Sequence, residues 1–352
     1  MATQTAASRL ASALQKYCLA RVITSPKITC LACNLEVPSL GLCPSALSML
    51  KADTTHIIHC AWNVNFALPL QCFRPDLAGL QNLLALSLTT TSRPEPAQVV
   101  FCSSIAAALG TIPPALIPQT TLGISKASAT GYGRSKAIAE HIVERAVRDS
   151  GVSAKIVRIG QIVPSRKEGA SKLWNVNEMI PLLIRSALTI EALPDTLNGG
   201  DSCDWIEVNV VSRLICGVAG LSREVGPGRD SELLYNAVHP IAFSWRDEFL
   251  PKLRKSGLVF QIVGYEEWLQ QLHGSEVDLV KNPSRKLLGF WKTPRQGEHG
   301  EIKFDTSAKD QTSVSSLGQL RAVEGDLVTE LVAAWMKAWE NPAPTLMTKR
   351  TT

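Results

Sequence analysis

The chain of 352 residues has little charge and few aromatic residues: 19% of its side chains are charged and 6% are aromatic. Its 36 basic and 31 acidic residues are interspersed and give a net charge of +5. Proteins that bind nucleic acid usually carry a basic stripe with aromatic residues between the charges. This sequence has no such stripe, so no nucleic-acid partner is expected. No apolar run approaches the roughly 20 residues of a membrane-spanning helix, so no membrane partner is expected either.

Glycine is absent where a dinucleotide-binding protein most needs it. The first glycine of the chain is Gly41, and no GxGxxG or GxxGxxG spacing occurs anywhere. Such turns bring a helix N-terminus up to the pyrophosphate of a dinucleotide. The sequence therefore lacks the strongest signal for a dinucleotide anchor.

Acidic residues are absent from Met1 to Leu35, where the basic residues are Arg9, Lys16, Arg21 and Lys27. This composition is typical of a mitochondrial transit peptide. It also suits an ordinary amphipathic helix, whose apolar face would carry Leu10, Leu14, Tyr17 and Cys18. We favour the helix, because the pattern runs directly into a strand-like segment, and we expect a cytoplasmic location.

The nine cysteines lie mostly in apolar runs and predict reduced thiols in the core. Cys30 and Cys33, with His56 and His59, superficially resemble a zinc site. Residues three apart on a strand point to opposite faces, however. We therefore predict no metal site.

Short apolar runs alternate with helical patterns in the first half of the chain. The four predicted strands are Lys27–Ala32, His56–Ala61, Gln98–Ser103 and Ala154–Ile159. The two predicted helices between them are Asp76–Leu88 and Tyr132–Ser150. Continuous apolar strands that alternate with helices are typical of a parallel sheet with both faces covered, so the sequence predicts an α/β fold.

After Ile159 the pattern becomes mixed. We expect a helix at Met179–Ala187, strands at Trp205–Val211 and Leu233–Ala237, and mostly helix from Trp245 to Trp291. Gly297–Gln319 reads as a surface loop. A last helix, Val323–Glu340, is expected to dock on the second lobe through its tryptophans.

Tyr132 and Lys136 form a YxxxK pattern near the start of a predicted helix, 28 positions after Ser104, where a predicted strand ends. Residues four apart share a helix face. An ammonium beside a phenol favours phenolate and lowers the pKa of the phenol towards the working range. A serine hydroxyl at the same point can stabilise an oxyanion. The three side chains together predict a carbonyl reductase, whereas an exposed Tyr–Lys pair without chemistry is the alternative.

With these motifs the chain resembles the extended short-chain dehydrogenase/reductases, and within them the thioester reductase domains of fungal non-ribosomal-peptide-synthetase-like adenylate-forming reductases and carboxylic acid reductases. The resemblance runs from about Arg9 to Trp339. The segments that carry it are His56–Phe66, Leu68–Leu70, Phe101–Ser104, Gly131–Lys136, Arg158–Ile162, Trp174-Asn175, Pro181–Ile184, Ala192–Pro194, Trp205-Ile206 and Tyr265–Trp268.

The resemblance implies NADPH-dependent reduction of an acyl thioester, or of an aldehyde, in a fungal secondary-metabolite pathway. Ser104, Tyr132 and Lys136 would be catalytic. The implied cofactor-binding residues are Asn34, Cys60, Ala61, Ser103, Tyr132, Lys136, Gln161 and Ile162. The substrate would arrive on a carrier protein or on coenzyme A, or as a small aldehyde.

The resemblance also implies a domain division. Residues 1–164 would form the NAD(P)-binding core, to which 203–243 return, and 165–202 with 244–345 would form a smaller, mixed substrate lobe. Residues 346–352 would be a tail. The first strand–helix–strand unit of a Rossmann-like sheet, with its glycine-rich loop, is missing from this pattern.

Two further positions depart from the family pattern: Cys33-Asn34-Leu35 stands where Gly-Asp-Leu is usual, and Asn209 stands where an aspartate is expected. The missing unit would lie between Lys27–Ala32 and His56–Ala61, so its absence would open a gap there or make these two strands pair directly. A partner chain that supplies the missing half, and a binding or scaffold protein without catalysis, therefore stay open as alternatives.

Overall fold

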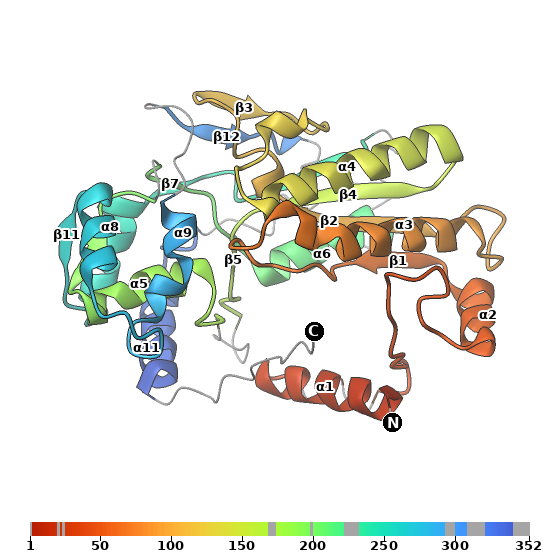
Figure 1. Cartoon of the computed structure of the whole chain (residues 1–352), viewed down its shortest axis with the longest axis horizontal. Coiled ribbons are helices and arrows are strands. Elements are labelled where there is room, and N and C mark those ends of the chain that lie inside the picture. Colours follow the sequence, from red (N-terminus) through yellow and green to blue (C-terminus); the bar gives the residue numbers. More distant parts are fainter. Residues whose placement is uncertain are drawn as a thin grey trace.

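The computed structural model of the chain describes residues 2–19, 22, 25–167, 174–197, 200–221, 232–292, 300–307 and 321–340. They form a parallel sheet with helices on both faces and, beside it, a second group of helices and short strands (Figure 1). In this part of the chain, no helix combines the length and the hydropathy that crossing a bilayer requires.

The sheet has four parallel strands in the order β1-β2-β4-β9. They are β1 (His56–His59), β2 (Gln98–Ser104), β4 (Ala154–Ile159) and β9 (Leu234–Ala237). Three of the four strands predicted in the first half, and the strand predicted at Leu233–Ala237, are confirmed, and with them the α/β class. Because the strands are parallel, their carboxyl ends meet at one edge of the sheet, where ligands of such folds bind.

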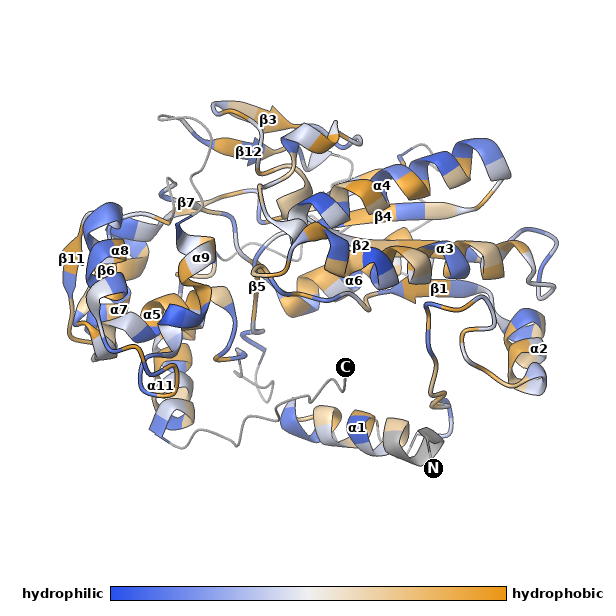
Figure 2. Ribbon diagram, viewed as in Figure 1, coloured by the Kyte–Doolittle hydropathy of each residue, from blue (hydrophilic) through white to orange (hydrophobic). Residues whose placement is uncertain are grey.

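Helices cover both faces because side chains along a buried strand alternate between them. Val99 and Phe101 of β2 pack with α3 (Arg74–Leu88) and α4 (Gly131–Ser150). Val100, between them, packs with α6 (Val208–Val218) on the other face. Figure 2 shows the matching pattern, with hydrophobic colour along β2 and polar colour on much of α4. Each fully buried side chain of this kind contributes about 1.5–3 kcal/mol.

The predicted strand Lys27–Ala32 is wrong. These residues lie in no strand, and in the described sheet β1 has β2 as its only neighbour. The chain instead turns after Asn34, whose backbone N–H donates to the carbonyl of Leu40 at 2.8 Å. Leu40 then packs against α3. Contact with a helix has replaced strand pairing, so the direct pairing with His56–Ala61 does not occur.

The predicted strand Trp205–Val211 is also largely wrong. Strand β8 covers only Ile206–Glu207, and helix α6 begins at Val208. The valines of this run favour strands locally, but Val210, Val211, Leu214 and Val218 lie on one face of the helix and are buried against the sheet. Tertiary packing has overridden the local preference of β-branched residues.

The second group of elements has its own apolar core. Its members are α5 (Met179–Thr189), β6 (Ala192–Pro194), α7 (Leu250–Lys255), β11 (Gln261–Val263), α8 (Tyr265–Gly274), α9 (Leu288–Trp291) and α11 (Leu327–Glu340). Trp245, Trp268 and Trp335 are fully buried in it. The last helix therefore docks through its tryptophans, as predicted, and helix is the main element of the Trp245 to Trp291 stretch, interrupted by β11. The division into a cofactor core and a substrate lobe stays a prediction.

The surface loop predicted for Gly297–Gln319 contains a strand. β12 (Ile302–Phe304) pairs with β3 (Ala115–Ile117), far away in sequence. Of the predicted loop, residues 297–299 and 308–319 lie outside the described residues. The other α-helices and strands of the described residues are α1 (Ala2–Lys16), α2 (Pro44–Asp53), β5 (Ile162–Val163), β7 (Ser202–Cys203) and β10 (Phe243–Ser244). Short helical turns are η2 (Leu70–Phe73), η3 (Ile105–Ala107), η4 (Ile124–Lys126), η5 (Trp245–Phe249) and η6 (Pro283–Leu287).

The N-terminal segment forms helix α1, which lies apart from the sheet in Figure 1. Its predicted apolar face is not covered, since Leu10 is 37% exposed.

The expectation of core thiols is wrong for most cysteines. Cys102 and Cys203 are buried, whereas Cys18, Cys33, Cys43, Cys60 and Cys72 are exposed.

Candidate active site

The first turn of α4 brings Tyr132 and Lys136 to the carboxyl edge of the sheet. Thr130 caps the helix, because its hydroxyl accepts a hydrogen bond from the backbone N–H of Gly133 at 3.0 Å. Tyr132 is 7% exposed and Lys136 is 3% exposed. The predicted pair is therefore buried and does not lie on a solvated helix face.

The glycines on either side of Tyr132 allow this close approach. A Cβ atom on Gly131 would lie 2.3 Å from the carbonyl oxygen of Leu68. A Cβ atom on Gly133 would lie 2.7 Å from the carbonyl oxygen of Ala106. No side chain fits at either position, so both glycines are needed for the helix to start where it does.

Ser104 ends β2 and caps the short helical turn Ile105–Ala107, accepting a hydrogen bond from the backbone N–H of Ala106 at 3.2 Å. Its hydroxyl also hydrogen-bonds with the Tyr132 phenol. The serine and the tyrosine predicted from sequence therefore meet in the structure.

Lys136 lies in an aromatic enclosure. Its Nζ donates to the carbonyl oxygen of Cys102 at 2.7 Å. It also lies 4.3 Å from the centre of the Trp62 ring and 4.8 Å from that of Phe101, at cation–π distance. Burial in these surroundings lowers the pKa of Lys136 to about 7. The amine is thus poised between its charged and neutral forms near neutral pH.

Tyr132 is enclosed by Phe66 and Phe73, whose ring centres lie 5.1 and 6.3 Å from its own. Burial raises the pKa of Tyr132, and the hydrogen bond with Ser104 opposes that rise. The direction is opposite to the one expected from the Tyr–Lys spacing, because desolvation of the phenolate is the largest effect in this enclosure.

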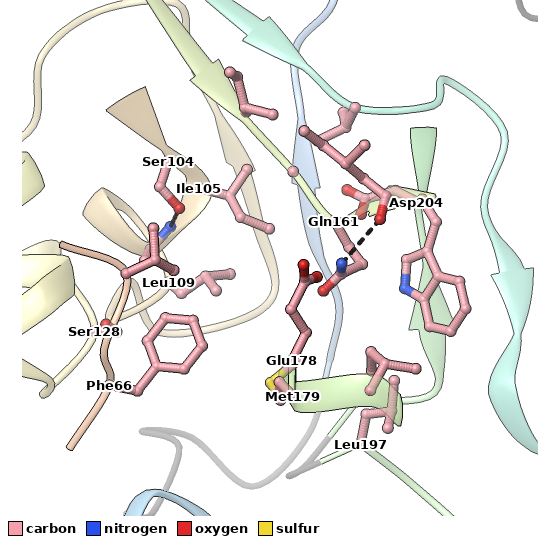
Figure 3. A pocket seen from close by; sticks show the side chains of 18 of the residues that line it. Phe66, Ser104, Ile105, Leu109, Ser128, Gln161, Glu178, Met179, Leu197 and Asp204 are labelled. Carbon is pink, nitrogen blue, oxygen red and sulfur yellow. Dashed lines mark hydrogen bonds between the residues drawn. The ribbon is translucent and has the colours of Figure 1, made fainter. Parts of the chain in front are cut away.

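Ser104, Tyr132 and Lys136 line a cavity of about 1850 Å³ that extends from the strand ends to the second group of elements. Figure 3 shows Ser104, Ile105 and Leu109 on one side of it, and Gln161, Glu178 and Met179 on the other. Both apolar and polar side chains line it. A cavity of this size can hold a large ligand.

Glu178 is a polar residue of this cavity that the sequence pattern did not single out. It precedes α5, and its carboxylate accepts a hydrogen bond from the Trp174 indole at 2.8 Å. Desolvation raises the pKa of Glu178. No local motif marks this residue, because only the fold brings it to the cavity that Ser104 lines (Figure 3).

Most of the predicted cofactor residues reach the cavity. Cys60, Ser103, Gln161 and Ile162 line it together with Tyr132 and Lys136. Two predicted residues do not join them. Asn34 lies in the turn packed on α3, where its side chain accepts from the backbone N–H of Glu36 at 3.0 Å, and Ala61 is exposed outside the lining. Asn34 is kept away because the segment that carries it packs on a helix instead of joining the sheet.

The Ser103 hydroxyl is committed elsewhere. It donates to the carboxylate of Glu140 at 2.6 Å. Glu140 also forms a buried ion pair with Arg158, at 2.6 Å. The O–H of Ser103 is therefore used within the protein, in a polar network that ties α4 to β4.

The zinc-like pattern does not assemble. His56 hydrogen-bonds with Thr55 at 2.9 Å, and His59 stacks on Phe101. Among the residues that the structure describes, no group of three histidine, cysteine or acidic side chains is placed to hold a metal ion.

The chain is similar in sequence to a known protein family and to several known proteins. The family model described as "Male sterility protein" (NAD_binding_4) matches residues 2–215. The chain is 28% identical over 317 residues to a carboxylic acid reductase of Neurospora crassa, covering 87% of the chain and 29% of that protein. It is 32% identical over 322 residues to the non-canonical non-ribosomal peptide synthetase ascB of Acremonium egyptiacum, covering 90% and 28%. The chain thus spans less than a third of the length of these relatives.

Solved structures share the fold at lower identity. The terminal R domain from the myxalamid PKS-NRPS biosynthetic pathway superposes with a TM-score of 0.78 at 20% identity, covering 98% of this chain and 84% of that one. The reductase domain of a Mycobacterium tuberculosis non-ribosomal peptide synthetase gives a TM-score of 0.70 at 14% identity, covering 95% and 82%. With the family model matching more than half of its residues, the chain belongs to the NAD-binding family described as "Male sterility protein", and its fold is that of these reductase domains.

Proposed function

We propose that the chain reduces an acyl thioester to an aldehyde with NADPH. The observation that carries the proposal is the convergence of Ser104, Tyr132 and Lys136 on one cavity at the carboxyl edge of the parallel sheet. The names of the sequence relatives, which include a carboxylic acid reductase, support the same reaction class.

The residues present fit the nicotinamide end of such a cofactor. An ammonium has three N–H donors, and one of those of Lys136 is occupied by the Cys102 carbonyl. The others are left for ribose hydroxyls. Cys60, Gln161 and Ile162 line the same cavity. When bound, the reduced nicotinamide supplies a hydride. The preference for NADPH over NADH rests on the resemblance to thioester reductases.

The chain's own side chains would handle the oxygen and the proton. The Ser104 hydroxyl donates to the thioester oxygen as negative charge develops on it. The Tyr132 phenol, kept protonated by burial, gives its proton to that oxygen once the carbonyl carbon has gained a hydride. The product is a hemithioacetal. Its carbon–sulfur bond then breaks, and the hydroxyl proton passes to the departing thiolate, so an aldehyde and a free thiol are released. Further reduction to an alcohol would use the same groups.

The cavity beyond the catalytic triad suits an acyl group. Ile105, Leu109 and Met179 offer apolar contact, and Glu178 offers one acceptor (Figure 3). We propose that the acyl chain lies here, with its thiol carrier, either a carrier protein or coenzyme A, outside. An acyl chain that bears a hydroxyl or amino group could donate to Glu178.

The test is aldehyde formation by the purified chain from acyl coenzyme A thioesters and NADPH, followed by nicotinamide absorbance and by trapping the aldehyde. Tyr132→Phe should lower the rate by about 10²–10⁴-fold. Tyr235→Phe is the matched control, because Tyr235 is buried against α6 and does not line the cavity. If wild type and Tyr132→Phe are equally inert, the chain is not a reductase by this site.

A binding or scaffold role is the second candidate, favoured by one observation: the chain has no glycine-rich turn for a pyrophosphate. Titration calorimetry with NADPH separates the two roles. Sub-micromolar binding by this chain alone would exclude the scaffold role, whereas no detectable heat would favour it.

A further inference from the structure

Two cysteines stand side by side at the carboxyl ends of neighbouring strands. His59, the last residue of β1, pairs with Phe101 of β2. The residue after each is a cysteine: Cys60 directly follows β1, and Cys102 lies within β2. Their sulfur atoms lie 3.4 Å apart. Both side chains line the cavity that holds the catalytic groups. The proposed reduction uses neither thiol.

The two thiols differ in accessibility and acidity. Cys60 is exposed, whereas Cys102 is buried. The hydrogen bond from Cys102 and the Lys136 ammonium together lower the pKa of Cys60 to about 7, and proximity to Cys60 raises the pKa of Cys102. An accessible thiol that ionises near neutral pH, next to a protonated one, is the arrangement of redox-sensitive cysteine pairs.

The strands already hold the pair at disulfide distance. Neighbouring strands lie about 4.8 Å apart, within the range of about 4.4–6.8 Å that disulfides span between Cα atoms. The sulfurs must close from 3.4 Å to about 2.05 Å. Rotation of the exposed Cys60 side chain can achieve this.

We propose that Cys60 and Cys102 form a reversible dithiol–disulfide pair that hydrogen peroxide oxidises. The Cys60 thiolate attacks a peroxide oxygen, the O–O bond breaks, and the hydroxide that leaves takes up a proton. The resulting sulfenic acid is attacked by the Cys102 sulfur. The S–S bond forms, the S–O bond breaks, and water leaves with the Cys102 proton. Two thiols are oxidised by two electrons, one peroxide is reduced to two waters, and an external dithiol reverses the reaction.

The disulfide would switch off the reductase, a consequence that rests on the proposed function. Lys136 is held by the carbonyl oxygen of Cys102, and Cys60 lines the proposed nicotinamide end. Joining the two sulfurs turns the Cys60 side chain towards Cys102 and so changes the cavity wall beside Lys136. Bound NADPH would cover Cys60 and slow its oxidation.

The experiment treats the full chain with one equivalent of hydrogen peroxide, with and without NADPH, and maps non-reduced peptides by mass spectrometry. We expect a Cys60–Cys102 linkage, the loss of two titratable thiols, slower oxidation with NADPH, and recovery with dithiothreitol. Cys60→Ser and Cys102→Ser should each abolish the linkage. Cys72→Ser is the matched control, because Cys72 is also exposed but is outside the cavity lining, and it should still form the linkage. Circular dichroism of each variant checks folding.

Mass spectrometry tests whether Cys60 and Cys102 form a disulfide, and the activity assay tests whether that disulfide switches off the reductase. If Cys60 is oxidised to sulfinic acid or links to another cysteine, the dithiol proposal is overturned. If the linkage forms and an active enzyme keeps its rate, the switch is overturned. If the linkage forms and neither form reduces a thioester, the proposed function fails while the dithiol pair stands.

Discussion

Tyr132 and Lys136 are each shifted towards the neutral form by burial. Desolvation raises the pKa of Tyr132 and lowers the pKa of Lys136 to about 7. For reduction of a carbonyl this is useful, because a phenol that stays protonated is ready to give its proton to the oxygen. The lysine then acts chiefly by position, between the Cys102 carbonyl and the Trp62 and Phe101 rings.

The pKa of Lys136 predicts how stability depends on pH. It is about 7 in the folded chain and about 10.4 in an unfolded one. Between these values the unfolded state binds more protons, so the free energy of unfolding rises with pH. Wild type should therefore gain stability relative to Lys136→Met from about pH 6 to about pH 10. Urea unfolding at a series of pH values measures this.

The control for this prediction is Lys126→Met, which removes an exposed lysine. Its unfolding free energy should follow that of wild type across the pH range. A Lys136→Met curve that also runs parallel to wild type would contradict the burial account of Lys136.

The three catalytic candidates could be predicted from the sequence because the spacing of Tyr132 and Lys136 is a local helix property. The surroundings that set the pKa values of Tyr132 and Lys136 could not be predicted in this way. Trp62 and Phe101 come from separate segments and meet over Lys136 only after folding. The Ser103 hydroxyl donates to Glu140, a contact across 37 positions that no short pattern reveals, and a cofactor role of Ser103 stays a prediction.

At the scale of elements, helix α4 is positioned by close backbone contact. A Cβ atom on Gly133 would lie 2.7 Å from the Ala106 carbonyl. Gly133→Ala should therefore cost about 1–3 kcal/mol of unfolding free energy and lower activity by displacing Tyr132. Gly264→Ala, whose Cβ would meet open space, should change stability by less than about 0.5 kcal/mol. Equal stability of the two variants in urea would contradict the packing account.

The Glu140–Arg158 ion pair fixes α4 against β4. Both side chains are buried, at 2% and 0% exposure. Glu140→Gln would leave the Arg158 charge without a counter-charge, so we expect a loss of about 3–5 kcal/mol. Glu144→Gln, one turn further along and 35% exposed in its pair with His141, should cost less than about 1 kcal/mol. Urea unfolding compares them, and similar losses would show that the buried pair does not hold the helix.

Elements were predictable where hydrophobic pattern and packing agree. The buried runs of β2 and β4 and the periodic helix α4 are cases of this kind. Lys27–Ala32 has a strand composition, but its chain segment packs on α3 through Leu40. Val208–Val218 has β-branched residues, but the sheet face needs a helix over Val100 and Val157. The local hydrophobic pattern of a segment does not show which surface that segment covers in the fold.

At the scale of the whole molecule, the cavity lies where the sheet edge meets the second apolar group of elements. Ser104 comes from the sheet and Glu178 from the segment before α5, and the two face each other across it (Figure 3). The resemblance to thioester reductases suggested this arrangement of two lobes, whereas hydrophobic periodicity alone suggested only an α/β class. The sequence pattern gives no distance between segments as far apart in the chain as those of Ser104 and Glu178, and only the folded structure does.

The most direct test of the account follows one hydrogen atom. The purified chain is mixed with an acyl thioester and with NADPH that carries deuterium at both C4 positions of the nicotinamide, and the aldehyde is analysed by mass spectrometry. We predict one deuterium on the aldehyde carbon with wild type, and product reduced by about 10²–10⁴-fold with Tyr132→Phe. Aldehyde without deuterium, or equal labelled product from both proteins, would contradict a reduction that depends on the Tyr132 phenol.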